Sequence, residues 1–174
     1  ALYSGQQHVR LMRGVEAFRS LAKNGSYLDL KVLSAGYGLV GAEALLAPYE
    51  ATFQGMPARQ LREWADTLEI PGAIRDALRE PYDLALILLG DGYLSACKLE
   101  AEVALGGPTL LFCGSRMAAK LPELPHLHVV PLSNREAKRF SCGLVALKGE
   151  LGARILAAIA GQPSTKFLGE MTKS

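Results

Sequence analysis

Residues 28–49 read LDLKVLSAGYGLVGAEALLAPY, and this stretch decides the fold class that the sequence predicts. The apolar run at 28–33 has the length and composition of a buried strand, and it stops abruptly at the small residues SAGYG at 34–38. A Pro48-Tyr49 pair follows. In α/β proteins a buried strand that ends in small residues brings backbone N–H groups and hydroxyls to one place, where ligands commonly bind. We therefore expect a ligand site at this turn.

Two later segments repeat the same construction. The run YDLALILL at 82–89 leads into Gly90 and Asp91, and the run TLLFC at 109–113 leads into the small residues of 114–116. Near-continuous apolar runs of this length are typical of parallel strands that are covered on both faces. A further apolar segment at 127–132 predicts a fourth strand. Because the carboxyl ends of parallel strands meet at one edge of a sheet, we expect the three turns to converge on a crevice.

Helical spacing of apolar residues predicts helices between these strands. The predicted helices lie at 6–23, 57–68, 71–80, 94–105 and 147–160, with shorter ones at 42–46, before Leu121 and after Ser133. Trp64 belongs to the apolar stripe of 57–68, so we expect it in the core. The alternation predicts an α/β fold with a mostly parallel sheet flanked by helices. We expect a single domain at 1–160 and a C-terminal tail at 161–174.

Length, charge and cysteine content narrow the class of function. A chain of 174 residues suits one hydrophobic core, and a net charge of +2 is too small for a protein that coats nucleic acid by bulk electrostatics. Three widely spaced cysteines predict reduced thiols. No apolar run approaches the ~20 residues of a membrane span, and the N-terminus lacks a signal-peptide layout. We therefore expect a cytoplasmic protein without membrane contact.

Phosphate-binding and nucleophile motifs of known spacing are absent from the sequence. It contains no G-x-x-x-x-G-K-[ST], no G-x-G-x-x-G and no G-x-S-x-G. Nucleoside-triphosphate hydrolysis, standard dinucleotide redox chemistry and an α/β-hydrolase mechanism are therefore disfavoured. The sequence predicts no cofactor and no metal site.

Side chains near the three turns are the candidate ligand contacts. Tyr37, Tyr49 and Tyr93 lie near predicted strand ends, where their rings could stack on a base and their hydroxyls could bind a sugar. Asp91 lies between two glycines after a strand, where it could act as a base, hold a ribose hydroxyl or cap the following helix. Capping is the simplest of these roles. Ser115 and Arg116 follow the third turn and add a hydroxyl and a positive charge.

A second source of positive charge follows the fourth strand. The pattern SNRE at 133–136 predicts a capping box, and Arg135, Lys138 and Arg139 lie in the first turns of the helix that it opens. Cations at a helix N-terminus oppose the helix dipole, which suggests that an anionic ligand binds there. The alternative is that these cations pair with acidic side chains elsewhere in the chain.

The segment VLSAGYGLVGAEALLAPYE at 32–50 resembles the motif of the YaaA peroxide-stress family and of related uncharacterised domains. In that motif a strand leads into S-x-x-Y-G-[LV] and then into a P-Y unit. The segment LILLGDGYLSAC at 86–97 is similar to a family strand that is followed by a small-residue turn and a tyrosine. The residues at 133–155 resemble the family's C-terminal segment in character, and the YSG at 3–5 resembles an early Y-x-G.

This resemblance implies a compact α/β domain with a positively charged groove, and it implies DNA binding and protection from oxidative damage as the associated role. Carried over by position, the residues that would line the groove are Ser34, Tyr37, Gly38, Pro48, Tyr49 and Tyr93. The chain departs from the family at its start. Related domains begin with a strand, upstream of the Y-x-G, that ends in small polar residues and a Lys or Arg, so part of the site could be missing here.

Three hypotheses of function follow. The first is a nucleic-acid- or nucleobase-binding domain of a YaaA-like protein, which extends to processing of damaged bases if the chain has base-directed activity. In that case Asp91 is the candidate catalytic group, Tyr37 and Tyr49 hold a flipped base, and Arg116, Arg135 and Lys138 hold the phosphates. The second is an enzyme that acts on a free nucleotide or nucleoside, such as an N-glycosidase. The third is a non-catalytic interaction domain. The oligomeric state is left open.

Overall fold

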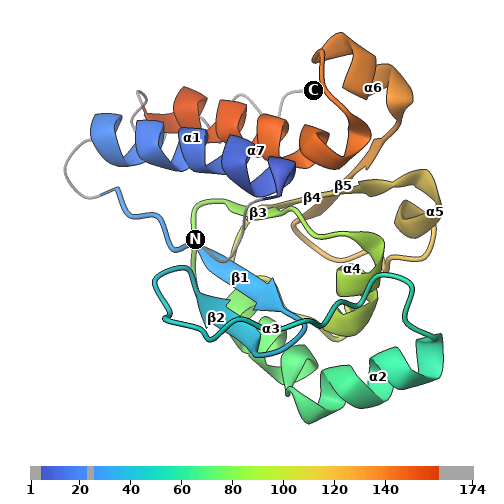
Figure 1. Cartoon of the computed structure of the whole chain (residues 1–174). Coiled ribbons are helices and arrows are strands. Elements are labelled where there is room, and N and C mark those ends of the chain that lie inside the picture. Colours follow the sequence, from blue (N-terminus) through green and yellow to red (C-terminus); the bar gives the residue numbers. More distant parts are fainter. Residues whose placement is uncertain (1–4, 23–25, 161–174) are drawn as a thin grey trace. The chain divides into compact units, whose positions relative to one another are not determined.

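The structure is a computed structural model of the chain and describes residues 5–22 and 26–160 (Figure 1). Residues 30–132 form one compact unit, and the described residues before 30 and after 132 form a second. The two units are described separately below. A single domain at 1–160 stays a prediction, and the tail at 161–174 lies outside the described residues. Within the described ranges, no helix is both long and apolar enough to cross a membrane.

The unit of residues 30–132 contains a three-stranded parallel sheet. Its strands are β3 (Ala85–Ile87), β4 (Thr109–Gly114) and β5 (Leu127–Leu132), side by side in chain order. The central strand β4 is buried from 109 to 113. Both faces of the strand are covered, which explains why the apolar residues of 110–113 follow one another without alternating with polar ones. Helices flank this sheet, so the predicted α/β class is confirmed for this part of the chain.

The stretch at 28–49 forms a hairpin instead of a strand of that sheet. Strand β1 (Lys31–Ser34) pairs antiparallel with β2 (Gly38–Gly41), with Ser34 opposite Gly38. Gly38 has a φ of +74°, and the backbone oxygen of Leu68 lies 2.8 Å from where its Cβ would be, so a larger residue would be strained. The prediction that this turn lies beside the other two at one parallel edge is wrong. Residues 42–46, expected to form a helical turn, are not helical.

Four helices accompany these strands. They are α2 (Ala58–Thr67), α3 (Ile70–Arg79), α4 (Asp91–Cys97) and α5 (Ser115–Ala118). The predicted helices at 57–68 and 71–80 are confirmed, with ends shifted by one residue. The helix expected at 94–105 ends at Cys97, because Lys98 adopts a left-handed backbone with a φ of 46°. Lys98 Nζ donates to both carboxylate oxygens of Asp66, at 2.7 and 2.9 Å, and so ties the end of α4 to α2.

The core of this unit joins the hairpin turn to α2 and α4. Its buried members are Leu33, Ala35, Phe53, Leu61, Ala65, Ile70, Ala96 and Cys97. Burial raises the pKa of the Cys97 thiol to about 12, because the thiolate would lose its hydration. The Cys97 thiol donates to the backbone oxygen of Tyr93 at 3.2 Å. Cys97 is therefore a packing residue that stays protonated at neutral pH.

The second unit is built on two helices that run side by side in the same direction, α1 (Gln6–Leu21) and α7 (Leu144–Ala160) (Figure 1). Gly14 of α1 packs directly on the backbone of Ala153, and Gly149 of α7 packs directly on the backbone oxygen of Gln7. Glycine usually weakens a helix interior, but here the absence of a side chain at Gly14 and Gly149 allows the helix backbones to touch.

An ion-pair network crosses the same helix pair. The Glu150 carboxylate accepts from Arg10 Nη1 at 2.9 Å and from Arg154 Nε at 2.7 Å. The hydrogen bond from Arg154, followed by that from Arg10, lowers the pKa of Glu150. The Arg154 guanidinium also lies over the Phe140 ring, 5.1 Å from its centroid. Glu150 therefore fixes the rotation of α7 against α1.

We predict that Gly149→Ala destabilises the protein. A methyl group at this position meets a backbone oxygen that cannot move unless α1 moves, and overpacking of this kind costs roughly 1–3 kcal/mol. This exceeds the gain of roughly 1 kcal/mol that alanine brings to a helix interior. Gly72→Ala is the matched control, because Gly72 also lies within a helix, α3, and nothing lies within 4 Å of its Cβ position. The urea midpoint, followed by circular dichroism, should fall only for Gly149→Ala; an unchanged midpoint would contradict the proposed close packing.

Candidate functional site

The Ser34 side chain organises the hairpin turn. It is fully buried, and its Oγ accepts from the backbone N–H groups of Gly36 and Tyr37, at 3.1 Å each. Its hydroxyl hydrogen is donated to Tyr49 Oη at 2.7 Å. A serine hydroxyl has one hydrogen and two lone pairs, so these three bonds use its full capacity. Ser34 therefore shapes the site, and its hydroxyl has no bond left to offer a ligand.

Tyr37 and Tyr49, two of the residues that the resemblance assigns to a groove, meet at this turn. Their rings pack edge to face, with centroids 5.3 Å apart and an interplanar angle of 81°. Tyr37 Oη donates to the backbone oxygen of Ala47 at 3.3 Å. The ring of Tyr49 lies against Gly36, where a Cβ would come within 2.6 Å of it. Glycine at 36 is therefore required for Tyr49 to reach Ser34.

The loop between β2 and α2 joins this turn to the second small-residue turn. Four residues after Tyr49, the buried Phe53 packs edge to face on Tyr93 with ring centroids 5.2 Å apart. The Cβ position of Gly92 lies 2.6 Å from the backbone oxygen of Phe53, so only glycine permits this contact. The motifs at 34–38 and 89–93 are thus connected through the loop, and not through neighbouring strand ends.

Tyr93 and Asp91 differ from their predicted roles. Tyr93 is half-buried and packs against the core, so its ring supports Phe53. Asp91 is the first residue of α4, and the N-cap position belongs to Gly90, which makes no side-chain cap bond. The prediction that Asp91 caps this helix is therefore wrong. Its exposed carboxylate lies in the first turn of α4, where the helix dipole stabilises a negative charge. No described residue donates a hydrogen bond to this carboxylate.

The remaining predicted contacts in this unit are exposed, except for Gly38. Pro48 lies beside Tyr49 in the loop, and Gly38 is buried at the start of β2. Ser115 and Arg116 open the four-residue helix α5 at the carboxyl end of β4. Because β3 and β4 are neighbours, the turns after these two strands do meet at one edge, as predicted. Arg116 forms no ion pair with the acidic residues that the structure describes.

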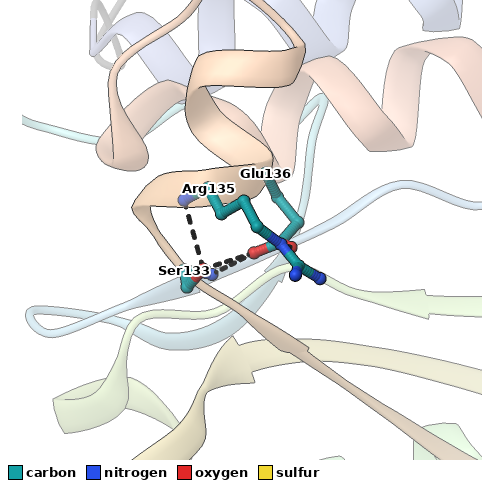
Figure 2. A network of polar contacts seen from close by, with 3 residues as sticks. All are labelled: Ser133, Arg135 and Glu136. Atoms are coloured by element: carbon teal, nitrogen blue, oxygen red, sulfur yellow. Dashed lines mark hydrogen bonds and ion pairs between the residues drawn. The ribbon is translucent and has the colours of Figure 1, made fainter.

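Arg135 and Lys138 belong to the unit that does not contain the hairpin turn. The predicted capping box is confirmed: Ser133 Oγ accepts from the N–H of Arg135 at 3.2 Å, and Glu136 accepts from the N–H of Ser133 at 2.9 Å (Figure 2). Arg135 Nε pairs with Glu136 at 3.2 Å. Helix α6 (Asn134–Arg139) has only six residues, so Lys138 and Arg139 lie in its last turn.

The short length of α6 removes the electrostatic conflict that the sequence suggested. Cations in the last turn of a helix are favoured by its dipole, so Lys138 and Arg139 need no anionic ligand to explain them. Arg135 has its acidic partner within the capping box. The electrostatic argument for an anionic ligand at these three cations is therefore removed, and the candidate site is described without them.

Trp64 is the surface residue that the sequence interpretation missed. It was expected in the core, but 39% of it is exposed. Its indole N–H donates to the backbone oxygen of Ala35 at 2.7 Å, inside the same hairpin turn that Ser34 holds. The buried face of α2 is filled by Leu61 and Ala65 instead. The partial exposure of Trp64 could have been inferred from its indole N–H, because this group requires a hydrogen-bond acceptor that a purely apolar core lacks.

Comparison of the chain with protein-family models, with curated proteins and with solved structures finds no match. The resemblance to the YaaA family therefore stays a hypothesis that rests on the motifs at 32–50 and 86–97. No group of three or more His, Cys, Asp or Glu side chains in the described part of the chain could hold a metal ion.

We predict that Ser34→Ala destabilises the protein by about 1–3 kcal/mol. The substitution removes the acceptor for two N–H groups and the donor to Tyr49 in a buried place, where unsatisfied polar groups are costly. Ser95→Ala is the control, because the Ser95 hydroxyl is exposed and bonds only the backbone oxygen of Asp91. Urea unfolding of the two variants measures the difference; equal midpoints would show that the Ser34 bonds contribute nothing net.

We also predict that the carboxyl of Glu136 titrates far below its ordinary range. Its pKa is lowered to about 2, chiefly by the hydrogen bond from the Ser133 side chain and to a lesser degree by that from Arg135. Stabilisation by this group is therefore complete at neutral pH and is lost as pH falls through the folded pKa. In an NMR titration the pKa should rise more in Ser133→Ala than in Arg135→Gln. A larger rise in Arg135→Gln would reverse the assigned order of causes.

Proposed function

We propose that this chain is a nucleic-acid- or nucleobase-binding domain of the YaaA-like kind, and that its contact surface is centred on Tyr37. The observation that supports the proposal is that Tyr37 is exposed and at the same time held in place by a hydrogen bond. The residue is 41% exposed although its hydroxyl is bonded to the backbone of the same unit. It stands on the turn whose sequence carries the resemblance, at 34–38.

A fixed and exposed aromatic ring suits stacking on a base. One edge contact, from Tyr49, holds the Tyr37 ring, and the bond to Ala47 restricts its rotation. Every nucleobase has a flat π-face, and stacking of a base on an aromatic side chain contributes roughly 1–3 kcal/mol. Because the ring is already oriented, little conformational entropy is lost when a ligand binds.

Charge supports a modest affinity for nucleic acid. The chain carries only two more basic than acidic residues, so most binding energy would come from a local contact and not from a strongly basic face. Arg116 is one of several exposed cations of the same unit that form no ion pair with the acidic residues that the structure describes, and it follows the third small-residue turn. It is a candidate phosphate contact. No described group activates the Asp91 carboxylate, so the proposal covers binding and not base processing.

The test is fluorescence anisotropy of labelled single-stranded and duplex DNA at low salt. We expect binding that weakens steeply between about 50 and 200 mM salt if several phosphates are contacted. Tyr37→Ala should weaken it about fivefold or more, and Tyr37→Phe, which keeps the ring, should bind almost as the wild type does.

Tyr27→Ala is the matched control, since Tyr27 is 84% exposed but lies outside the unit of the hairpin turn. It should bind as the wild type does. If neither DNA form nor a panel of free nucleotides binds at low salt, the proposed function is wrong. Equal losses in Tyr27→Ala and Tyr37→Ala would show that binding is not centred on the hairpin turn.

A further inference from the structure

We propose that Trp64 is a second stacking surface on the hairpin turn, and that the unit therefore selects unpaired bases of single-stranded nucleic acid over duplex. This inference rests on the proposed function and names its ligand class. Trp64 reaches the turn from α2, through its bond to Ala35, two residues before Tyr37.

The orientation of Trp64 leaves only ring carbon for a ligand. The indole Nε1 is its single polar atom, and it is already bonded to the backbone oxygen of the fully buried Ala35 at 2.7 Å. The hydroxyl of Tyr37 is likewise bonded within the protein. Two partly exposed rings whose polar atoms are occupied can offer their π-faces, but no hydrogen bonds to base edges. Such a surface would bind bases with little sequence preference.

The backbone that carries Trp64 is firmly placed. Its neighbours Leu61 and Ala65 are buried in the core that also contains Ala35. The bond from Trp64 thus links two segments that are packed together independently of it. The ring stays exposed without being mobile, which lowers the entropic cost of stacking.

Uncharged or paired residues surround the ring on α2. Gln60 and Thr67 are its exposed neighbours one turn before and after, and neither carries a charge. The Thr67 hydroxyl donates to the backbone oxygen of Glu63, whose carboxylate pairs with Arg59 at 2.8 Å. These neighbours on α2 favour a neutral, flat group such as a base.

Whether a base is already stacked on its neighbours determines whether Trp64 can bind it. Within a duplex each base is stacked on both faces, so an aromatic side chain can stack on a base only where it is unpaired or splayed out. Two rings fixed to one turn therefore suit a flexible single strand. Because Trp64 contacts a base and not phosphate, it should contribute equally at every salt concentration.

Trp64 is the only tryptophan of the chain, so its fluorescence reports this contact directly. The full chain is titrated with an oligothymidylate, and with a duplex of mixed sequence, while indole emission is recorded. We expect quenching by the single strand and little change with the duplex. Binding seen by anisotropy with unchanged Trp64 emission would overturn this inference while the proposed function stands. No binding of either DNA form would also overturn this inference, and the proposed function would fail with it only if free nucleotides do not bind either.

Two substitutions separate stacking from a structural role. Trp64→Phe and Trp64→Leu both lose the bond to Ala35, but only phenylalanine keeps an aromatic face. We expect Trp64→Leu to bind the single strand about fivefold or more weaker than Trp64→Phe, with the same dependence on salt. Equal affinities of the two variants, or a changed salt dependence, would contradict stacking by Trp64.

Discussion

The Ser34 hydroxyl holds three partners at the tip of the β1–β2 hairpin, and the rest of the candidate site follows from them. Its two accepted bonds close the turn, and its donated bond places Tyr49 over Gly36. Tyr49 then supports the Tyr37 ring. The loop between β2 and α2, which contains Tyr49, continues to Phe53. Phe53 packs on Tyr93 at the start of α4. One saturated hydroxyl thereby connects the hairpin to the helical part of the unit.

The sequence predicted the parts of the fold that local pattern determines. Strands β4 and β5 agree with their predicted ranges at 109–113 and 127–132 to within one residue. Continuous burial explains the apolar run of β4, whereas β5 is only partly buried. The segment at 28–33 also predicts a strand, but Asp29 and Lys31 interrupt its apolar residues, and the strand that forms, Lys31–Ser34, belongs to a hairpin. Whether a strand pairs in parallel or antiparallel depends on a partner, and the partner here is the four-residue strand β2, which is too short to give a clear pattern.

The wrong expectations at the candidate site arose where the sequence does not determine the end of a helix or its buried face. The cations of α6 were assigned to its first turns, but Phe140 ends the helix after six residues and Ser141 turns left-handed with a φ of 50°. The sign of the dipole interaction reverses with that boundary. Trp64 shows the same limit on a helix face. Helical spacing assigns it to the buried stripe, whereas the side chains that complete the core come from Leu61 and Ala65.

Tyrosine and tryptophan at a protein surface usually bury the ring and keep the polar tip in water. Tyr37 and Trp64 show the opposite arrangement: the tips bond backbone oxygens of the unit, and about two fifths of each residue is exposed. A purely structural role would be served as well by aliphatic side chains, which require no hydrogen-bond acceptor. The use of two backbone oxygens, those of Ala47 and Ala35, to hold exposed rings is therefore the strongest argument that these rings contact a ligand.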